Sequence, residues 1–491
     1  MEKKNVFDLP FILQRLGLLI FALFPVTLSI ISQTFLVASS WNFTKLFFLG
    51  GLVAVFLTPL FAMFSSKSIG VLIEKFEPLA IFWVIGLAFV LRIVLVQLIS
   101  TDFVSDFEDI HFVAVDIFSG NTLENLDEYP NIPRAIHLNM PALILSFVYK
   151  LFGASTTTAK LFMIVLSVLT TLIVFFVGKE VANTKTGFVT AFLFAVLPSI
   201  VCYTGMLAGD HLFLPLMILA VLIFARMQKV HITNLFSLVF GYAILGAIVG
   251  LMDWFRPLGP IFLSALIISL LVYYARKWKT LKLAILISTL LITYSLTSNL
   301  AITISKSLFQ VNTISTSQKM GEYFLVGLNP NSHGKISLED STLIGKTHAR
   351  FKDDNLGAQL YLAQLAISRL DQEQAINLFK DKFTLVWSSH DALFDYSLIG
   401  SNDHELVNLL RDFETLLWLI VTIFILFNTV LSIRKKTHPA IFTMQLFILG
   451  FAILLIFMEV QNRYVIVIIP FSLLLAAIGM NQLFSRKIKL S

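Results

Sequence analysis

The stretch that decides the fold is residues 441–484, IFTMQLFILGFAILLIFMEVQNRYVIVIIPFSLLLAAIGMNQLF. It contains two long apolar runs, and its only charged residues, Glu459 and Arg463, lie in the short break between them. A helix needs about 20 apolar residues to cross the hydrocarbon core of a membrane. Each run therefore predicts one membrane-spanning helix, and the polar break is expected at the membrane surface.

The composition extends this prediction to the whole chain. Of the 491 residues, 57% are hydrophobic, and the mean hydropathy is +0.85. Only 13% are charged, against roughly 25% in soluble domains. Because backbone polar groups in lipid must be satisfied internally, long apolar runs are expected to be helical. We expect an all-α polytopic protein of the cell membrane with about 12 spanning helices. They are expected near residues 14–36, 44–64, 78–99, 158–178, 186–205, 211–227, 234–251, 258–275, 281–303, 414–432, 441–458 and 464–484.

Positive charges predict how these spans are oriented. Lys and Arg gather in alternate loops, such as 434–436 and 486–489, and the positive-inside rule assigns such loops to the cytoplasm. Both termini are then cytoplasmic, and the other polar clusters face the outer side. The run at 133–152, with Asn139 and Pro141, fits this alternation only as a re-entrant or interfacial helix. The net charge of +6 is thus explained by topology, and no nucleic-acid partner is expected.

Two segments between spans are long enough to carry functional groups outside the membrane. One is an acidic loop at about 100–132, and the other, at about 304–412, has ordinary globular composition. We expect an N-terminal membrane region (1–303), a small extracytoplasmic domain (304–412) and C-terminal membrane helices (413–491). The single cysteine excludes an intrachain disulfide and a Cys-based zinc site.

The acidic loop contains the candidate catalytic bases. Asp106 and Asp109 are three residues apart, so they share a face of a helix that Gly120 is expected to end. A carboxylate at the edge of a low-dielectric cavity has a raised basicity and can deprotonate a hydroxyl. Asp102 and Glu108 lie close by in the sequence, so the base remains open among these four acids.

Other polar residues fall on the same predicted side. Asp210 lies at the start of a span, where an acid is costly without a partner; the alternative is a helix-capping Asp. Arg256 and Arg463 are candidate phosphate ligands, because a guanidinium binds phosphate through forked hydrogen bonds. For Arg463 the alternative is an ion pair with Glu459. Further candidate substrate-binding residues are Glu108, His111, Tyr129, His137 and Tyr464.

The predicted cytoplasmic loops are short and contain no phosphate-binding loop and no GxGxxG motif. A soluble nucleotide donor therefore has no predicted site, and a donor reached from the outer side would be carried by a lipid. One alternative is a secondary transporter, in which ionisable residues would lie near the bilayer midplane. Another is a polymerase or ligase of lipid-linked glycans.

Several short motifs occur in order along most of the chain. They are Ser105-Asp106-Phe107 with Tyr129-Pro130, Leu143–Gly153, Leu197-Pro198-Ser199 through Asp210, Phe255–Gly259, and Gln461-Asn462-Arg463-Tyr464 through Pro470. Together they resemble the GT-C glycosyltransferases that use polyprenyl-phosphate sugars. That group contains the protein O-mannosyltransferases (family 39 type) and the aminoarabinose transferases of lipid A. Tyr323–Asn329 followed by Glu339-Asp340-Ser341 resembles Gram-positive members that decorate cell-wall polymers.

The resemblance implies a mannosyltransferase-like enzyme that transfers a sugar from a polyprenyl phosphate to an extracytoplasmic glycan, teichoic acid, lipid or protein. It implies Asp106 as the catalytic acid of the first outer loop, with Asp210 assisting acceptor or metal binding. In-line attack would invert the anomeric configuration, and Arg256 or Arg463 would stabilise the departing phosphate. No metal-ligand set is predicted, and a divalent metal requirement is left open. A glycosyltransferase that loads the lipid carrier is a candidate partner, and whether it is obligatory is left open.

Overall fold

The computed structural model describes residues 9–120, 135–229, 234–274, 280–309, 319–352, 354–388, 390–400, 404–433 and 437–487. These residues form helices and connecting turns, with no strand among them. Within them, nine helical stretches are long and apolar enough to cross a membrane. The predicted all-α polytopic architecture is confirmed, while the total of about 12 spans stays a prediction.

Helices are found at every predicted apolar run. The first part of the membrane region contains α1 (Leu9–Phe21), the π-helical turn η1 (Ala22–Val26), α2 (Thr27–Ser40), α3 (Phe43–Ser65), α4 (Lys67–Lys75) and α5 (Glu77–Ile99). After the acidic loop follow α8 (Thr156–Val181), α9 (Thr184–Val196), α10 (Pro198–Tyr203), α11 (Asp210–Lys229), α12 (Leu235–Met252), α13 (Gly259–Tyr274) and α14 (Thr280–Phe309). The C-terminal part contains α20 (His404–Ile433), α21 (Pro439–Phe457), the 3₁₀ helix η4 (Asn462–Val467) and α22 (Ile469–Lys487).

The predicted span at 186–205 is not a single helix. It is divided into α9 and α10, and Leu197 between them is extended, with φ −62° and ψ 116°. The cause is Pro198, because proline lacks an N–H and disfavours the helical conformation in the residue before it. The chain beyond the break therefore takes a new direction before α11 begins.

Arg92, a charged residue within α5, stabilises this break. Its side chain is fully buried. Nη1 donates to the carbonyl oxygen of Ala195 at 2.9 Å, and Nη2 donates to that of Phe194 at 3.3 Å. Nε donates to Ser167 Oγ at 2.7 Å. Because a backbone carbonyl without a partner is costly in lipid, these bonds stabilise the end of α9 and thereby fix where α10 lies.

The acidic loop and the run at 133–152 form two helices that pack against each other. The first, α6 (Asp106–Ser119), ends as predicted at Gly120, whose φ of +72° is the left-handed conformation that glycine adopts without strain. The second, α7 (Ile136–Phe152), contains Pro141 and is shorter than the nine candidate spans. Its re-entrant placement stays a prediction.

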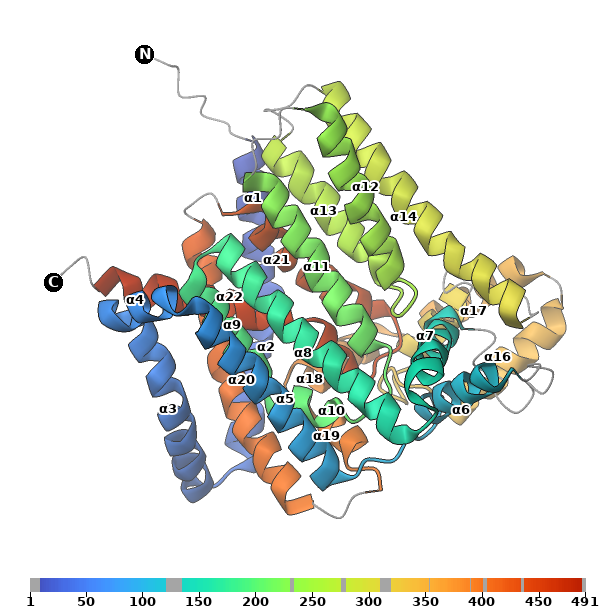
Figure 1. The fold of residues 1–491 in the computed structure, drawn as a ribbon. Coiled ribbons are helices and arrows are strands. Elements are labelled where there is room, and N and C mark those ends of the chain that lie inside the picture. The colour runs from blue at the N-terminus through green and yellow to red at the C-terminus, as the bar shows by residue number, and fades with distance from the viewer. Residues whose placement is uncertain are drawn as a thin grey trace.

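Five helices lie between α14 and α20 and form what we call the α15–α19 segment. They are α15 (Met320–Gly327), α16 (Leu338–Phe351), α17 (Asn355–Ser368), α18 (Gln372–Trp387) and α19 (Asp391–Ser397). Figure 1 shows α4 at one end of the helical bundle, on the left, and α6, α7, α16 and α17 at the opposite end, on the right. The helices α18 and α19 of the same segment lie nearer the middle of the picture, so the domain division and the sidedness stay predictions.

Candidate active site

An ion pair between Asp210 and Arg256 lies at the centre of the candidate site. Nε of Arg256 donates to Oδ1 of Asp210 at 2.6 Å, and Nη2 donates to Oδ2 at 2.8 Å. The Tyr203 hydroxyl also donates to Oδ2, at 3.2 Å. The Asp210 side chain is 1% exposed and that of Arg256 is 16% exposed. Asp210 is thus bound on both oxygens by a forked guanidinium, rather than free at the start of α11.

The turn between α12 and α13 fixes the position of Arg256. Asp253 accepts hydrogen bonds from the Gly259 N–H at 2.5 Å and from the Tyr294 hydroxyl at 2.5 Å. A Cβ atom at Gly259 would lie 2.5 Å from Asp253 Oδ1, so the close approach requires glycine there. Burial raises the pKa of Asp253 to about 6. Asp253 therefore stabilises the turn that carries Arg256.

Arg463, at the start of η4, has no anionic partner among the described residues. Its guanidinium carbon lies 5.0 Å from the ring centroid of Phe107 and 5.3 Å from that of Tyr396. Nε is buried and has no hydrogen-bond partner within the described parts of the chain. Glu459 instead accepts a hydrogen bond from Gln461 at 2.8 Å, so the alternative Glu459–Arg463 ion pair is not formed.

Tyr464 and His137 also belong to this site. The guanidinium carbon of Arg256 lies 5.1 Å from the ring centroid of Tyr464. His137 lies near enough to Arg256, Arg463 and Lys319 to be affected by their charges. Burial, followed by these positive charges, lowers the pKa of His137 to about 3, so its imidazole is neutral at pH 7. The site therefore combines two arginines, a neutral histidine and aromatic rings.

The acids of α6 have different surroundings. Asp106 is the first residue of α6 and is half-buried, and the ring of the next residue, Phe107, contacts the second arginine. Burial, together with the charges of Asp106 and Glu108, raises the pKa of Asp109. Glu108 is exposed. Within the described residues, no hydrogen bond or ion pair joins Asp106 to the central ion pair.

The remaining predicted residues lie apart from the central ion pair or outside the described chain. The N–H of Asp102 donates to the Ile399 carbonyl at 2.9 Å, which connects the loop before α6 to the end of α19. His111 Nδ1 lies 2.5 Å from the Tyr149 hydroxyl, in an aromatic cluster between α6 and α7. Tyr129 lies outside the described residues.

A second buried polar cluster is one that the sequence analysis missed. Glu414, in α20, accepts hydrogen bonds from the Ser199 hydroxyl at 2.5 Å and the Ser199 N–H at 2.6 Å. It also pairs with Nδ1 of His390, the residue before α19. Glu414 is 1% exposed and His390 is 3% exposed. The only signal in the sequence was an acid at the edge of an apolar run, which by itself does not identify a partner.

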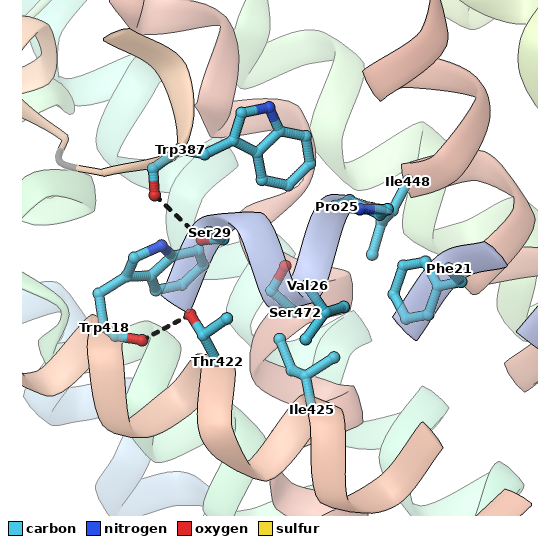
Figure 2. Close-up of a pocket in the computed structure, with 10 residues that line it drawn as sticks. All are labelled: Phe21, Pro25, Val26, Ser29, Trp387, Trp418, Thr422, Ile425, Ile448 and Ser472. Atoms are coloured by element: carbon cyan, nitrogen blue, oxygen red, sulfur yellow. Dashed lines mark hydrogen bonds between the residues drawn. The ribbon is translucent and has the colours of Figure 1, made fainter. Parts of the chain in front are cut away.

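A small internal cavity lies away from the arginines. Figure 2 shows it with Ser29 hydrogen-bonded to the Trp387 carbonyl and Thr422 to the Trp418 carbonyl. Its volume of about 20 Å³ has room for one water molecule. It is therefore too small for a sugar or a lipid.

A larger apolar groove lies on the surface between α13 and α21. Its volume is about 340 Å³. It is lined by Pro260, Ile261, Ser264, Ala265, Ile268, Leu446, Leu449, Gly450 and Ile453. Pro260 is in the first turn of α13, directly after the turn that carries Arg256. The groove therefore begins next to the turn that carries Arg256 and follows α13, although none of the site residues lines it.

The described residues contain no cluster of side chains that could bind a metal ion. Among them, no three His, Cys, Asp or Glu side chains are arranged to hold a metal ion. Asp210, the acid that the resemblance linked to metal or acceptor binding, is instead bound to Arg256 and Tyr203.

The central part of the chain matches a family model. Residues 137–300 match the model described as dolichyl-phosphate-mannose-protein mannosyltransferase. This part contains His137, Asp210 and Arg256, three residues of the candidate site. The predicted likeness to GT-C glycosyltransferases is confirmed by this match. None of the curated protein sequences matches the chain.

Three solved structures from Archaeoglobus fulgidus are similar to this chain. One is the archaeal oligosaccharyltransferase AglB in complex with an inhibitory peptide and a dolichol-phosphate, with 14% identity and a TM-score of 0.48 over 84% of this chain and 51% of that one. The others are an oligosaccharyltransferase complex with Zn and sulfate (14% identity) and an oligosaccharyltransferase tethered to an acceptor peptide (15% identity). Each has a TM-score of 0.37 over 72% of this chain, and 41% or 42% of the other chain is covered. The present chain spans about half the length of the first of these structures.

Proposed function

We propose that the protein is a membrane glycosyltransferase that transfers a sugar from a polyprenyl phosphate to an extracytoplasmic hydroxyl. Arg463 is the observation that carries this proposal. Its guanidinium has no anionic partner in the described chain, whereas Arg256 is already paired with Asp210. A desolvated charge without a partner is costly, so a cation left unpaired next to an ion pair is suited to an anionic ligand. We assign that place to the donor phosphate.

The groove between α13 and α21 supports a polyprenyl tail on the donor. It starts beside the turn of Arg256 and is lined almost entirely by apolar residues. A polyprenyl chain is already in an apolar medium in the bilayer, so the groove would gain little hydrophobic free energy by binding it. Its contribution would be packing and orientation of the donor, and the arginines would supply most of the affinity.

The proposed reaction is a single displacement at the anomeric carbon. The carboxylate of Asp106 accepts the proton of the acceptor hydroxyl as that oxygen attacks. The bond between the anomeric carbon and the phosphate oxygen breaks, and its electron pair leaves with the lipid phosphate. Arg463 stabilises the negative charge on this leaving group. Attack opposite the phosphate inverts the configuration. The acceptor would be the hydroxyl of a cell-wall glycan, a teichoic acid, a lipid or a protein.

Two charged residues within candidate spans bear on the transporter alternative. In a transporter they would lie along the path of the transported ion or solute. Arg92 donates only to Ser167 and to carbonyl groups at the end of α9 and in its own helix. Glu414 is occupied by Ser199 and His390. Both charges have local partners that explain them, so neither favours transport.

The first experiment identifies the sugar on the donor lipid. In a strain that lacks the protein, we expect one polyprenyl-phosphate sugar to accumulate, and that lipid then serves as the labelled donor for membranes. Mannose is the first sugar to test, because the matched family is described by its mannosyl phosphate donor. An unchanged set of lipid-linked sugars in the deletion strain would contradict the proposed function.

The role of Asp106 is tested with the same labelled donor. Asp106→Asn is expected to lower the turnover rate by about 10²–10⁴-fold, the range for loss of a general base, while binding of the lipid phosphate is retained. Asp116→Asn, a change of another acid in the same helix, serves as the control and should transfer sugar at the wild-type rate. Equal transfer by Asp106→Asn and wild-type membranes would exclude Asp106 as the base.

A further inference from the structure

We propose that the α15–α19 segment completes the donor phosphate site, with Tyr396 as the residue that positions Arg463. This inference rests on the proposed function and extends it, because it gives this segment a part in binding the donor. The inference is based on three sets of contacts. They are made by the side chain of Arg463, by the residues at the two ends of α19, and by the backbone that leads to Arg463.

The side chain of Arg463 lies in a corner formed by two aromatic rings. The rings of Phe107 and Tyr396 are nearly perpendicular, at 89°, with centroids 5.5 Å apart. The guanidinium carbon is 5.0 Å from the first centroid and 5.3 Å from the second. Ring faces attract a guanidinium without neutralising its charge. The corner can therefore orient Arg463 while its N–H groups stay available for a phosphate.

α19, which carries Tyr396, is fixed at both ends. Before its first turn, His390 pairs with Glu414 of α20, and both side chains are buried. After its last turn, the Ile399 carbonyl accepts a hydrogen bond from the N–H of Asp102 at 2.9 Å. Because α19 is only two turns long, these contacts determine where the Tyr396 ring lies. They also connect it to the loop that leads to the proposed base.

The same segment holds the backbone that leads to Arg463. Lys382 of α18 is buried, and its Nζ donates to the carbonyl oxygen of Met458 at 2.7 Å and to that of Gly327 at 2.9 Å. The N–H of Val460 donates to the Gly334 carbonyl at 2.9 Å. The α15–α19 segment thus contacts both the backbone before Arg463 and the side chain of the arginine itself.

The test measures the dissociation constant of a polyprenyl phosphate without a sugar, for the purified full chain in lipid nanodiscs. Tyr396→Leu removes the ring and is expected to raise this constant roughly three- to thirtyfold, the range for a cation–π contact. Tyr396→Phe keeps the ring and should bind as wild type does. An equal loss of binding in both variants would overturn positioning by the ring, because the hydroxyl would then be the group required, and unchanged binding in Tyr396→Leu would overturn the inference as well.

If Tyr396 acts by positioning Arg463, the effects of Tyr396→Leu and Arg463→Ala on the dissociation constant should not be additive. In an Arg463→Ala background, Tyr396→Leu should change the dissociation constant by less than about twofold. The same factor in both backgrounds would mean that Tyr396 acts independently of the arginine. If Tyr396→Leu does not fold, Tyr396→Met, which also removes the ring, replaces it, with the same expected effect and the same background test.

A matched control lies elsewhere in the same segment. The guanidinium carbon of Arg350 is 5.4 Å from the ring centroid of Tyr361, so Tyr361→Leu removes a similar contact away from the site. This variant should bind polyprenyl phosphate as wild type does. Absence of binding in the wild type would contradict the proposed function itself. Wild-type binding that Tyr396→Leu leaves unchanged would contradict only the role of the segment.

Discussion

Among single residues, Asp210 has surroundings that the sequence could not reveal. The resemblance implies an assisting acid in the reaction, but both of its carboxylate oxygens are bound by Arg256, and Tyr203 donates to one of them. Hydrogen bonds to the charged form make a carboxylate a weaker base. We therefore expect Asp210 to position Arg256. The sequence did indicate that an acid at this place needs a partner, but nothing in it pointed to Arg256 rather than to Arg463.

Substitution of Asp210 separates these two roles. Asp210→Asn leaves the guanidinium of Arg256 without its counter-charge, and we expect the free energy of unfolding in detergent to fall by about 3 kcal/mol. Removing both charges in Asp210→Asn/Arg256→Gln should restore part of that loss. A catalytic role for Asp210 would be supported instead if turnover fell by about 100-fold or more while stability stayed at the wild-type level.

Hydropathy predicted the positions of the helices well, but it did not predict where a helix is interrupted. The end of α6 at Gly120 was predictable because glycine adopts the left-handed conformation there without strain. The break at Pro198 lies in an uninterrupted apolar run, and the signal was the proline itself together with a buried charge, Arg92, in another span. Hydropathy averaged over a window of residues does not respond to a single proline. It also does not show that a side chain from another helix, such as Arg92, binds the carbonyl groups that the break leaves free.

The contact between α18 and the end of α21 has a pH dependence that can be measured. Burial lowers the pKa of Lys382 to about 7, below its usual value of 10.5. Between these two values the unfolded chain binds a proton that the folded chain does not, so stability rises with pH across that interval. The unfolding temperature of the wild type, relative to Lys382→Met, should therefore increase from pH 7 to pH 10. Lys380→Met, a change of an exposed lysine in the same helix, should keep the wild-type dependence.

Over the whole molecule, the sequence predicted that polar clusters lie on one side but not which of them meet. Asp210 is the first residue of α11, Arg256 lies before α13, and Arg463 lies in η4. Contacts between residues so far apart in the chain leave no local pattern in a single sequence. The composition and the apolar runs were sufficient for the all-α membrane architecture, and the short motifs were sufficient for the GT-C likeness. That Arg256 is ion-paired, and that Arg463 has no anionic partner in the described part of the chain, required the structure.

The central claim is that the donor phosphate binds at Arg463, and the most direct test is the affinity for a polyprenyl phosphate. A hydrogen-bonded charge pair contributes about 1.5–3 kcal/mol, so Arg463→Ala is expected to raise the dissociation constant by about ten- to hundredfold. Arg350→Ala, which removes an arginine that also contacts aromatic rings, is the control and should bind as wild type does. Equal affinity of Arg463→Ala and wild type would contradict the claim.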